Sequence, residues 1–149
     1  MKTITFLFAL FALAPVSTGR AQATLSAAES AAIRQPALDY LESWYEGNAE
    51  RMEGCLHPDL AKRIVRTDTN GVSRLDHMGA MKLVQNVRAG YGAKTPKGRQ
   101  QKDIIILDVF ENAASVKAIA SDWIDYLHVA KFNGRWVIIN VLWELNPKK

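Results

Sequence analysis

The sequence predicts an α+β fold, in which a strongly bent, mostly antiparallel sheet forms a cone around about three N-terminal helices. Segments with helical periodicity come first, and segments rich in β-branched and aromatic residues fill the chain after residue 103. Helices followed by a run of strands are typical of the α+β class. Two of the later segments exceed the usual strand length of about 5–6 residues, and strands this long normally bend. A bent sheet around helices leaves a cavity, so we also expect a small-molecule pocket.

The first helix is predicted by its cap and by its periodicity. Ser26 and Glu29 form the capping-box pattern S-x-x-E. Apolar residues then recur every three or four positions over residues 33–45, which indicates one buried face. Pro36 falls inside this pattern and is expected to kink the helix or to restart it. Gly47 is expected to end the helix.

Short elements are expected over the next thirty or so residues. Asn48 can cap a second, short helix that Pro58 stops. Arg63 to Thr67 and Val72 to Leu75 read as two short strands joined by a turn. Asp76 is expected to cap a third helix.

Three strand-like segments complete the chain: Asp103 to Glu111, Ser115 to Phe132 and Arg135 to Leu145. Asn133-Gly134 separates the last two, and Asn-Gly between β-rich runs is a strong hairpin signal. We therefore expect a long antiparallel meander.

The first residues resemble a secretory signal peptide. Lys2 precedes an uncharged apolar run from Ile4 to Leu13, and Ala21-Gln22-Ala23 has the small-x-small cleavage pattern. We expect residues 1–23 to be a signal peptide and 24–149 a single domain of the periplasm or the exterior. Such a domain would have 126 residues (149 minus 23), with no membrane contact after cleavage.

Composition argues against several kinds of partner. Loss of Lys2 and Arg20 would lower the net charge from +4 to +2, and the remaining basic residues are scattered, so we expect no nucleic acid partner. The three histidines and Cys55 do not form zinc-ligand spacing. We expect no metal and no cofactor. Cys55 is the single cysteine, so the chain cannot form an internal disulfide.

The predicted hairpin register suggests candidate site residues. With Asn133-Gly134 as a two-residue turn, alternation places an acid, a phenol, an imidazole and an indole on one face of the sheet. These are Asp122, Tyr126, His128 and Trp143. The other face carries mostly packing residues, namely Trp123, Leu127, Val129, Trp136 and Ile138, with Asp125 among them. We expect the first face to line the pocket, although a bulge in either strand would exchange the faces part-way along.

Two segments resemble a known family. They are YLESWYEGNAERMEGCLHPDLAKR (Tyr40 to Arg63) and DWIDYLHVAKFNGRWVIINVLWE (Asp122 to Glu144). Both are similar to the putative lumazine-binding family of the nuclear transport factor 2-like superfamily, and the resemblance spans about Ile33 to Pro147. It implies an α+β cone, the same order of elements as the periodicity predicts. The superfamily includes enzymes, binding proteins and interaction modules, so fold membership does not choose among them.

We therefore carry three functional hypotheses. The first is an exported protein that binds an aromatic or pteridine-like molecule, with a ligand site formed by Tyr40, Trp44, Asp122, Tyr126, His128 and Trp143. The second is a ketosteroid isomerase-like enzyme, dehydratase or cyclase. On one extended strand Asp122 and Tyr126 would be about 13 Å apart, too far for one substrate, so we lean against an enzyme and assign no catalytic residue. The third is an interaction module with a vestigial pocket. In each case large apolar residues on both sheet faces suggest a homodimer through the sheet.

Overall fold

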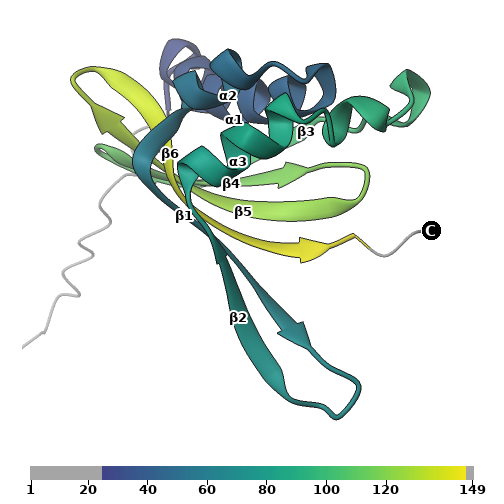
Figure 1. Ribbon diagram of the computed structural model, residues 1–149. Coiled ribbons are helices and arrows are strands. Elements are labelled where there is room, and N and C mark those ends of the chain that lie inside the picture. The colour runs from purple at the N-terminus through teal and green to yellow at the C-terminus, as the bar shows by residue number, and fades with distance from the viewer. Residues whose placement is uncertain (1–24, 147–149) are drawn as a thin grey trace, which may run out of the picture.

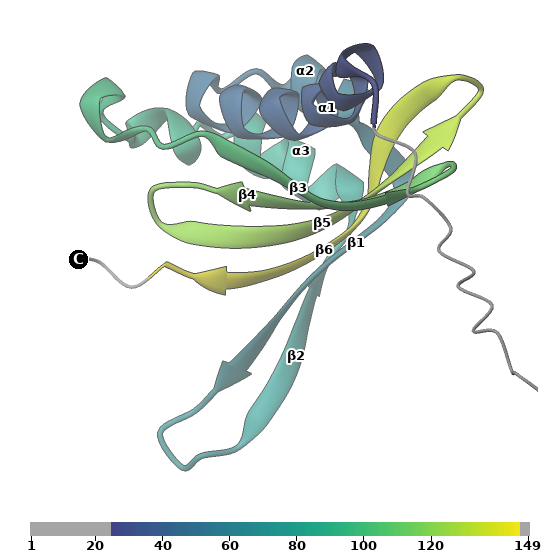
Figure 2. The ribbon, with the colours of Figure 1, turned by 180° about the vertical axis from the view of Figure 1, so that it is seen from behind.

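The computed structural model describes residues 25–146. Three α-helices lie over one face of a six-stranded sheet (Figures 1 and 2). The helices are α1 (Ala27–Glu46), α2 (Ala49–Cys55) and α3 (Ala80–Arg88). The strands are β1 (Leu56–Thr67), β2 (Ser73–Met78), β3 (Asp103–Phe110), β4 (Ala113–Ile119), β5 (Trp123–Phe132) and β6 (Arg135–Leu145), with two 3₁₀ turns at η1 (Gly92–Lys94) and η2 (Lys97–Arg99). The predicted α+β class and bent sheet are confirmed, while the expected signal peptide lies outside the described residues.

Helix α1 forms much as its sequence predicts. The Ser26 side chain accepts a hydrogen bond from the Glu29 amide at 3.1 Å, and Gly47 ends the helix in the left-handed conformation. Pro36 does not restart the helix, which runs unbroken from Ala27 to Glu46. The proline is buried on the face that packs against the sheet.

Helix α3 begins later than predicted. Asp76 does not cap it but belongs to β2, where its carboxylate pairs with Arg66 at 3.2 Å and Arg74 at 3.1 Å. Two guanidinium partners on the hairpin hold the carboxylate away from the helix. Gly79 takes the N-cap position without a side-chain hydrogen bond.

The sheet has the strand order β2-β1-β6-β5-β4-β3. Strand β1 pairs with β6 in parallel, and every other neighbouring pair is antiparallel. The parallel pair places the β1–β2 hairpin beside the C-terminal strand, and the hairpin extends away from the helices (Figure 1).

The segment from Ser115 to Phe132 is two strands rather than the one we expected. Strands β4 and β5 pair antiparallel around a tight turn, with Ile119 opposite Ile124. This turn contains no glycine or proline, and a tertiary contact supports it instead. The hydroxyl of Tyr45, on α1, accepts the Ser121 amide at 3.1 Å and donates to the Gln101 carbonyl at 3.0 Å.

The β5–β6 register matches the prediction only near the turn. Phe132 pairs with Arg135 and Val129 with Ile138, as expected, but His128 then pairs with Asn140. Ile139 is therefore an extra residue in β6, a bulge that moves the rest of the strand by one position. Beyond the bulge Trp143 lies opposite Asp125 rather than Ile124. The predicted face assignment is wrong for this part of β6.

The face of the sheet away from the helices exposes large apolar side chains together with charged ones. Leu142 and Tyr126 are about half exposed there, at 50% and 46%. Lys117 lies opposite Tyr126, with its ammonium 5.7 Å from the ring centroid. Dimerisation through this face stays a prediction, and light scattering that reports a monomer at micromolar concentration would contradict it.

The core lies between the helices and the sheet. Its fully buried side chains come from both layers, for example Ile33 and Leu41 of α1 and Leu127 and Val141 of the sheet. Among residues 25–146, no helix has both the length and the apolar character that a membrane crossing requires.

The chain approaches itself closely at Gly92, where η1 meets the end of α1. A Cβ atom at this position would lie 2.1 Å from the Trp44 carbonyl oxygen and 2.3 Å from its Cδ1 atom. Gly98, in the same connection, would meet nothing within 4 Å. Glycine at position 92 therefore allows the connection to pack against Trp44.

Gly92→Ala should lower the free energy of unfolding by about 1–3 kcal/mol, because the added methyl group must displace backbone or the indole. Gly98→Ala is the matched control and should change stability by less than about 0.5 kcal/mol. Urea unfolding of both variants measures the difference. Equal stabilities would show that the close contact is not present in solution.

Candidate functional site

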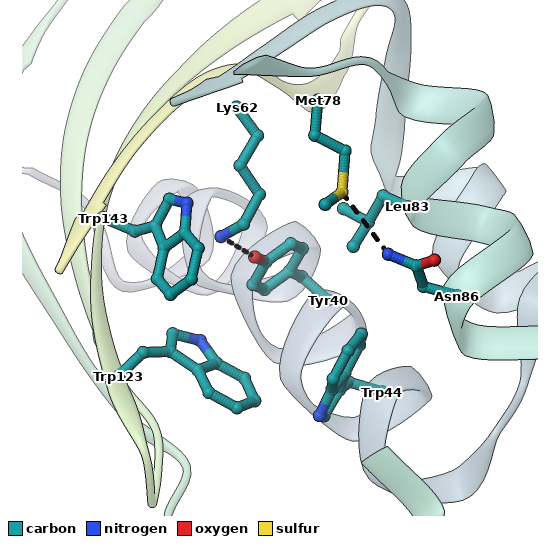
Figure 3. A pocket seen from close by; sticks show the side chains of 8 residues that line it. All are labelled: Tyr40, Trp44, Lys62, Met78, Leu83, Asn86, Trp123 and Trp143. Atoms are coloured by element: carbon teal, nitrogen blue, oxygen red, sulfur yellow. Dashed lines mark hydrogen bonds between the residues drawn. The ribbon is translucent and has the colours of Figure 1, made fainter. Parts of the chain in front are cut away.

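A cleft lies between the helices and the sheet, with a cavity volume of about 110 Å³. Its walls come from α1, α3, three strands of the sheet and the end of β2 (Figure 3). The lining residues are Tyr40, Trp44, Lys62, Met78, Leu83, Asn86, Trp123 and Trp143. An apolar cavity of about 150 Å³ can hold benzene, so one six-membered ring would fill this smaller cavity and extend from it toward solvent.

Aromatic side chains form much of the wall. Tyr40 and Trp44 stand four residues apart on α1 and therefore share a face of the helix. Trp44 meets Trp123 edge to face, with ring centroids 5.4 Å apart and an interplanar angle of 82°. Trp143 comes from β6 and lies beside them because of the bulge at Ile139.

An ammonium group lies at the polar end of this cleft. Lys62 Nζ donates to Asp125 Oδ1 at 2.5 Å and to the Tyr40 hydroxyl at 2.8 Å. It also lies 4.7 Å from the ring centroid of Trp143. Lys62 is 6% exposed and Asp125 is fully buried, which sets them apart from charged residues at the surface.

Burial shifts the pKa of each of these groups toward its uncharged form. Loss of water raises the pKa of Asp125 and lowers that of Lys62, and the attraction between the two charges opposes both shifts. Burial and the nearby Asp125 carboxylate raise the pKa of Tyr40 well above its usual value. The neutral forms of Lys62 and Asp125 are therefore more accessible here than for the same groups in water.

Two buried polar atoms of the site have no hydrogen-bond partner among the described residues: Asp125 Oδ2 and Trp123 Nε1. Unpaired buried polar atoms are rare in native proteins and call for an explanation, such as a catalytic role or a bound water. Both atoms belong to residues of β5 that point toward the helices. Burial raises the pKa of Asp125, but the Trp123 and Tyr40 side chains nevertheless stabilise its charged form and oppose this rise.

The structure brings together three of the six predicted site residues. Tyr40, Trp44 and Trp143 line the cleft. Asp122 lies in the β4–β5 turn, where its carbonyl accepts the Asn146 amide at 2.9 Å.

Tyr126 and His128 do not reach the cleft. They alternate with the buried Asp125 and Leu127 along β5, so they point to the opposite face of the sheet. The choice of face along β5 is therefore corrected. Their assignment to ligand binding stays a prediction that the geometry of the cleft does not support.

Sequence reasoning missed Lys62, Asp125 and Trp123 as site residues. Lys62 lies 63 residues from Asp125, in a segment expected to start a short strand only at Arg63. One signal was present, because Asp125 alternates with Trp123, Leu127 and Val129 on an otherwise apolar face. A lone acid in that setting needs a buried partner.

Cys55 lies outside the cleft lining, and its thiol donates to the Met52 carbonyl at 3.1 Å. Burial raises the pKa of this thiol to about 12, which keeps it protonated and unreactive near neutral pH.

Comparison with known families agrees with the fold. The model of the family described as "Putative lumazine-binding" matches residues 28–144. None of the curated proteins compared matches the chain.

Several solved structures share the architecture. An NTF2-like protein of unknown function from Shewanella baltica superposes with a TM-score of 0.62 at 16% identity, over 81% of this chain and 96% of that one. A protein with a cystatin-like fold from Nostoc punctiforme gives 0.60 at 19% identity, over 83% and 95%. A putative scytalone dehydratase from Novosphingobium aromaticivorans gives 0.52 at 15% identity, over 80% and 85%. At these identities the likeness concerns the fold alone.

The Lys62–Asp125 pair should show strong energetic coupling. Lys62→Met leaves a buried carboxylate without its cation and should cost about 3–5 kcal/mol of stability at pH 7. The double variant Lys62→Met/Asp125→Leu removes both charges with side chains of similar size and should regain at least about 2 kcal/mol of that loss. Urea unfolding of the two single variants and the double variant measures the coupling, and additive effects would contradict it.

The loss in Lys62→Met should also depend on pH. Without Lys62 the pKa of Asp125 rises further above its unfolded value of about 3.9. A raised carboxyl pKa favours the folded state at low pH, and this contribution disappears as the pH rises through the folded pKa. The deficit relative to wild type should therefore be smallest near pH 4 and grow toward pH 7. Unfolding curves across this range that show a constant deficit would be inconsistent with a buried Asp125.

Proposed function

This chain belongs to the putative lumazine-binding family, and we propose that it binds a small, flat aromatic molecule in the cleft beside Lys62. The observation that carries the proposal is the combination of aromatic walls with one buried ammonium. Ligand pockets are mostly apolar, with a few placed polar groups that fix orientation. This cleft has that composition.

The ammonium supports a ligand that carries an acceptor or an acidic group. An ammonium has three N–H donors, and Asp125 and Tyr40 take two of those of Lys62. The third remains for a ligand oxygen or nitrogen. A planar ring beside Trp143 would place its edge near this donor.

The size of the cleft limits the ligand. One ring would fill the cavity of about 110 Å³, and a second fused ring would extend toward solvent or require an indole to move. Lumazine, a bicyclic pteridine with two carbonyl oxygens, meets the chemical requirement and tests the size limit. A ligand of about a dozen non-hydrogen atoms at about 0.4–0.6 kcal/mol per atom would have a Kd of about 5–300 μM.

The enzyme hypothesis relied on a carboxylate and a phenol or imidazole donor from the β5 segment. Asp122, Tyr126 and His128 are not among the residues that line this cleft. Any chemistry in this cleft would depend on Lys62, Asp125 and Tyr40 instead.

Quenching of tryptophan fluorescence by lumazine should be saturable for the wild-type protein. Trp143→Ala should weaken binding at least about tenfold, because it removes the stacking surface closest to Lys62. Tyr126→Ala is the matched control, since it truncates an aromatic residue on the outer face of the same sheet, and it should bind as wild type does. Weaker binding by Tyr126→Ala alone would place the ligand on the outer face. No saturable binding by lumazine or by single-ring analogues such as benzoate would refute the proposal.

A further inference from the structure

Lys62 differs from a lysine whose role is only to form an ion pair. Lys62 is one of the residues that line the cleft, although it is only 6% exposed. Replacing a buried ion pair by apolar residues is often neutral or stabilising, so stability alone does not require one here. The neutral amine of a desolvated lysine is a nucleophile toward carbonyl carbon.

The neighbours of Lys62 have the groups that such a reaction uses. Asp125 Oδ1 already accepts a hydrogen bond from Lys62 Nζ at 2.5 Å. Asp125 Oδ2 has no hydrogen-bond partner among the described residues. A proton held on Oδ2 would leave Oδ1 as acceptor and the nitrogen lone pair free to face the cleft. The Tyr40 hydroxyl lies 2.8 Å from Nζ. It is therefore placed to donate a hydrogen bond to the oxygen of a ligand carbonyl group whose carbon is attacked by Nζ.

We propose that Lys62 forms a reversible imine with a small aromatic aldehyde bound in the cleft. This inference rests on the proposed binding function and names the ligand class more closely: a single aromatic ring with an aldehyde group pointing to Lys62. The cavity of about 110 Å³ limits the ligand to a single ring. The indoles of Trp44, Trp123 and Trp143 favour an aromatic ring over an aliphatic one.

The step balances without a cofactor. The Lys62 ammonium gives one proton to Asp125, and the amine nitrogen then forms a bond to the carbonyl carbon. The carbonyl π pair moves to oxygen, which takes a second proton from the now positively charged nitrogen and becomes a hydroxyl group. That hydroxyl leaves as water with the proton that Asp125 returns, and the C=N bond forms as a protonated imine. One ammonium and one aldehyde thus give one iminium and one water, and charge is conserved.

Burial also favours this reaction near neutral pH. It lowers the pKa of Lys62. The side chain of Lys82 on α3 is exposed to solvent and serves as the surface reference. The rate of imine formation at Lys62 should therefore exceed the rate at surface lysines most strongly near pH 7. This difference in rate should become smaller toward pH 10, where surface amines also lose their protons.

The test is reductive trapping with benzaldehyde and cyanoborohydride, read by intact mass and by peptide mapping. Wild-type protein at pH 7 should gain one benzyl group on Lys62 at least about tenfold faster than on Lys82. Lys62→Arg keeps a cation beside Asp125 but cannot form an imine, and it should lose this adduct while the slow surface reaction remains. Asp125→Asn should slow trapping at Lys62 but not at Lys82.

A parallel titration with benzyl alcohol, which has the same ring and no carbonyl group, separates the two proposals. Saturable binding of benzyl alcohol together with selective trapping at Lys62 supports the imine. Saturable binding without selective trapping overturns the imine and leaves the binding function standing. If neither occurs, with lumazine and benzoate also failing to bind, both proposals fall.

Discussion

The ion pair between Lys62 and Asp125 is the interaction on which the arrangement of the cleft depends. Lys62 belongs to β1 and Asp125 to β5, and β6 lies between these strands in the sheet. Tyr40 joins the pair from α1. The network therefore ties the parallel β1–β6 pair, the antiparallel meander and the first helix together at one point. The two charges are also the main polar groups within an otherwise apolar layer. Each therefore supplies the main electrostatic stabilisation of the other.

One irregularity of β6 makes this arrangement possible. Without the extra residue at Ile139, Trp143 would point to the outer face and the cleft would lose one aromatic wall. With it, Trp143 lies opposite Asp125 and beside the ammonium of Lys62. Bulges commonly redirect a side chain next to a functional site, and this one does so at the polar end of the cleft.

Much of the fold could be predicted from local signals. Caps at Ser26, Gly47 and Asn48 and the Asn133-Gly134 turn depend on a few neighbouring residues, and the structure has all of them. The β4–β5 turn was missed because its support comes from Tyr45, far away in the sequence. Asp76 was misassigned because its arginine partners lie on the β1–β2 hairpin, Arg66 on β1 and Arg74 on β2, and not on the helix.

The site was harder to predict than the fold for the same reason. Tyr40 and Trp44 follow from helical spacing, but the pairing of Lys62 with Asp125 requires the parallel β1–β6 contact, which no local pattern indicates. The face of Trp143 depends on a single inserted residue. Resemblance to the family and to structures of the same fold supports the architecture, and the function has to be argued from these few side chains.

A crystal structure of the protein soaked with lumazine would test the central claim most directly. The account predicts the ring against Trp143, with one ligand oxygen or nitrogen within about 3 Å of Lys62 Nζ. Lumazine bound instead on the outer face of the sheet, against Tyr126 and His128, would contradict it.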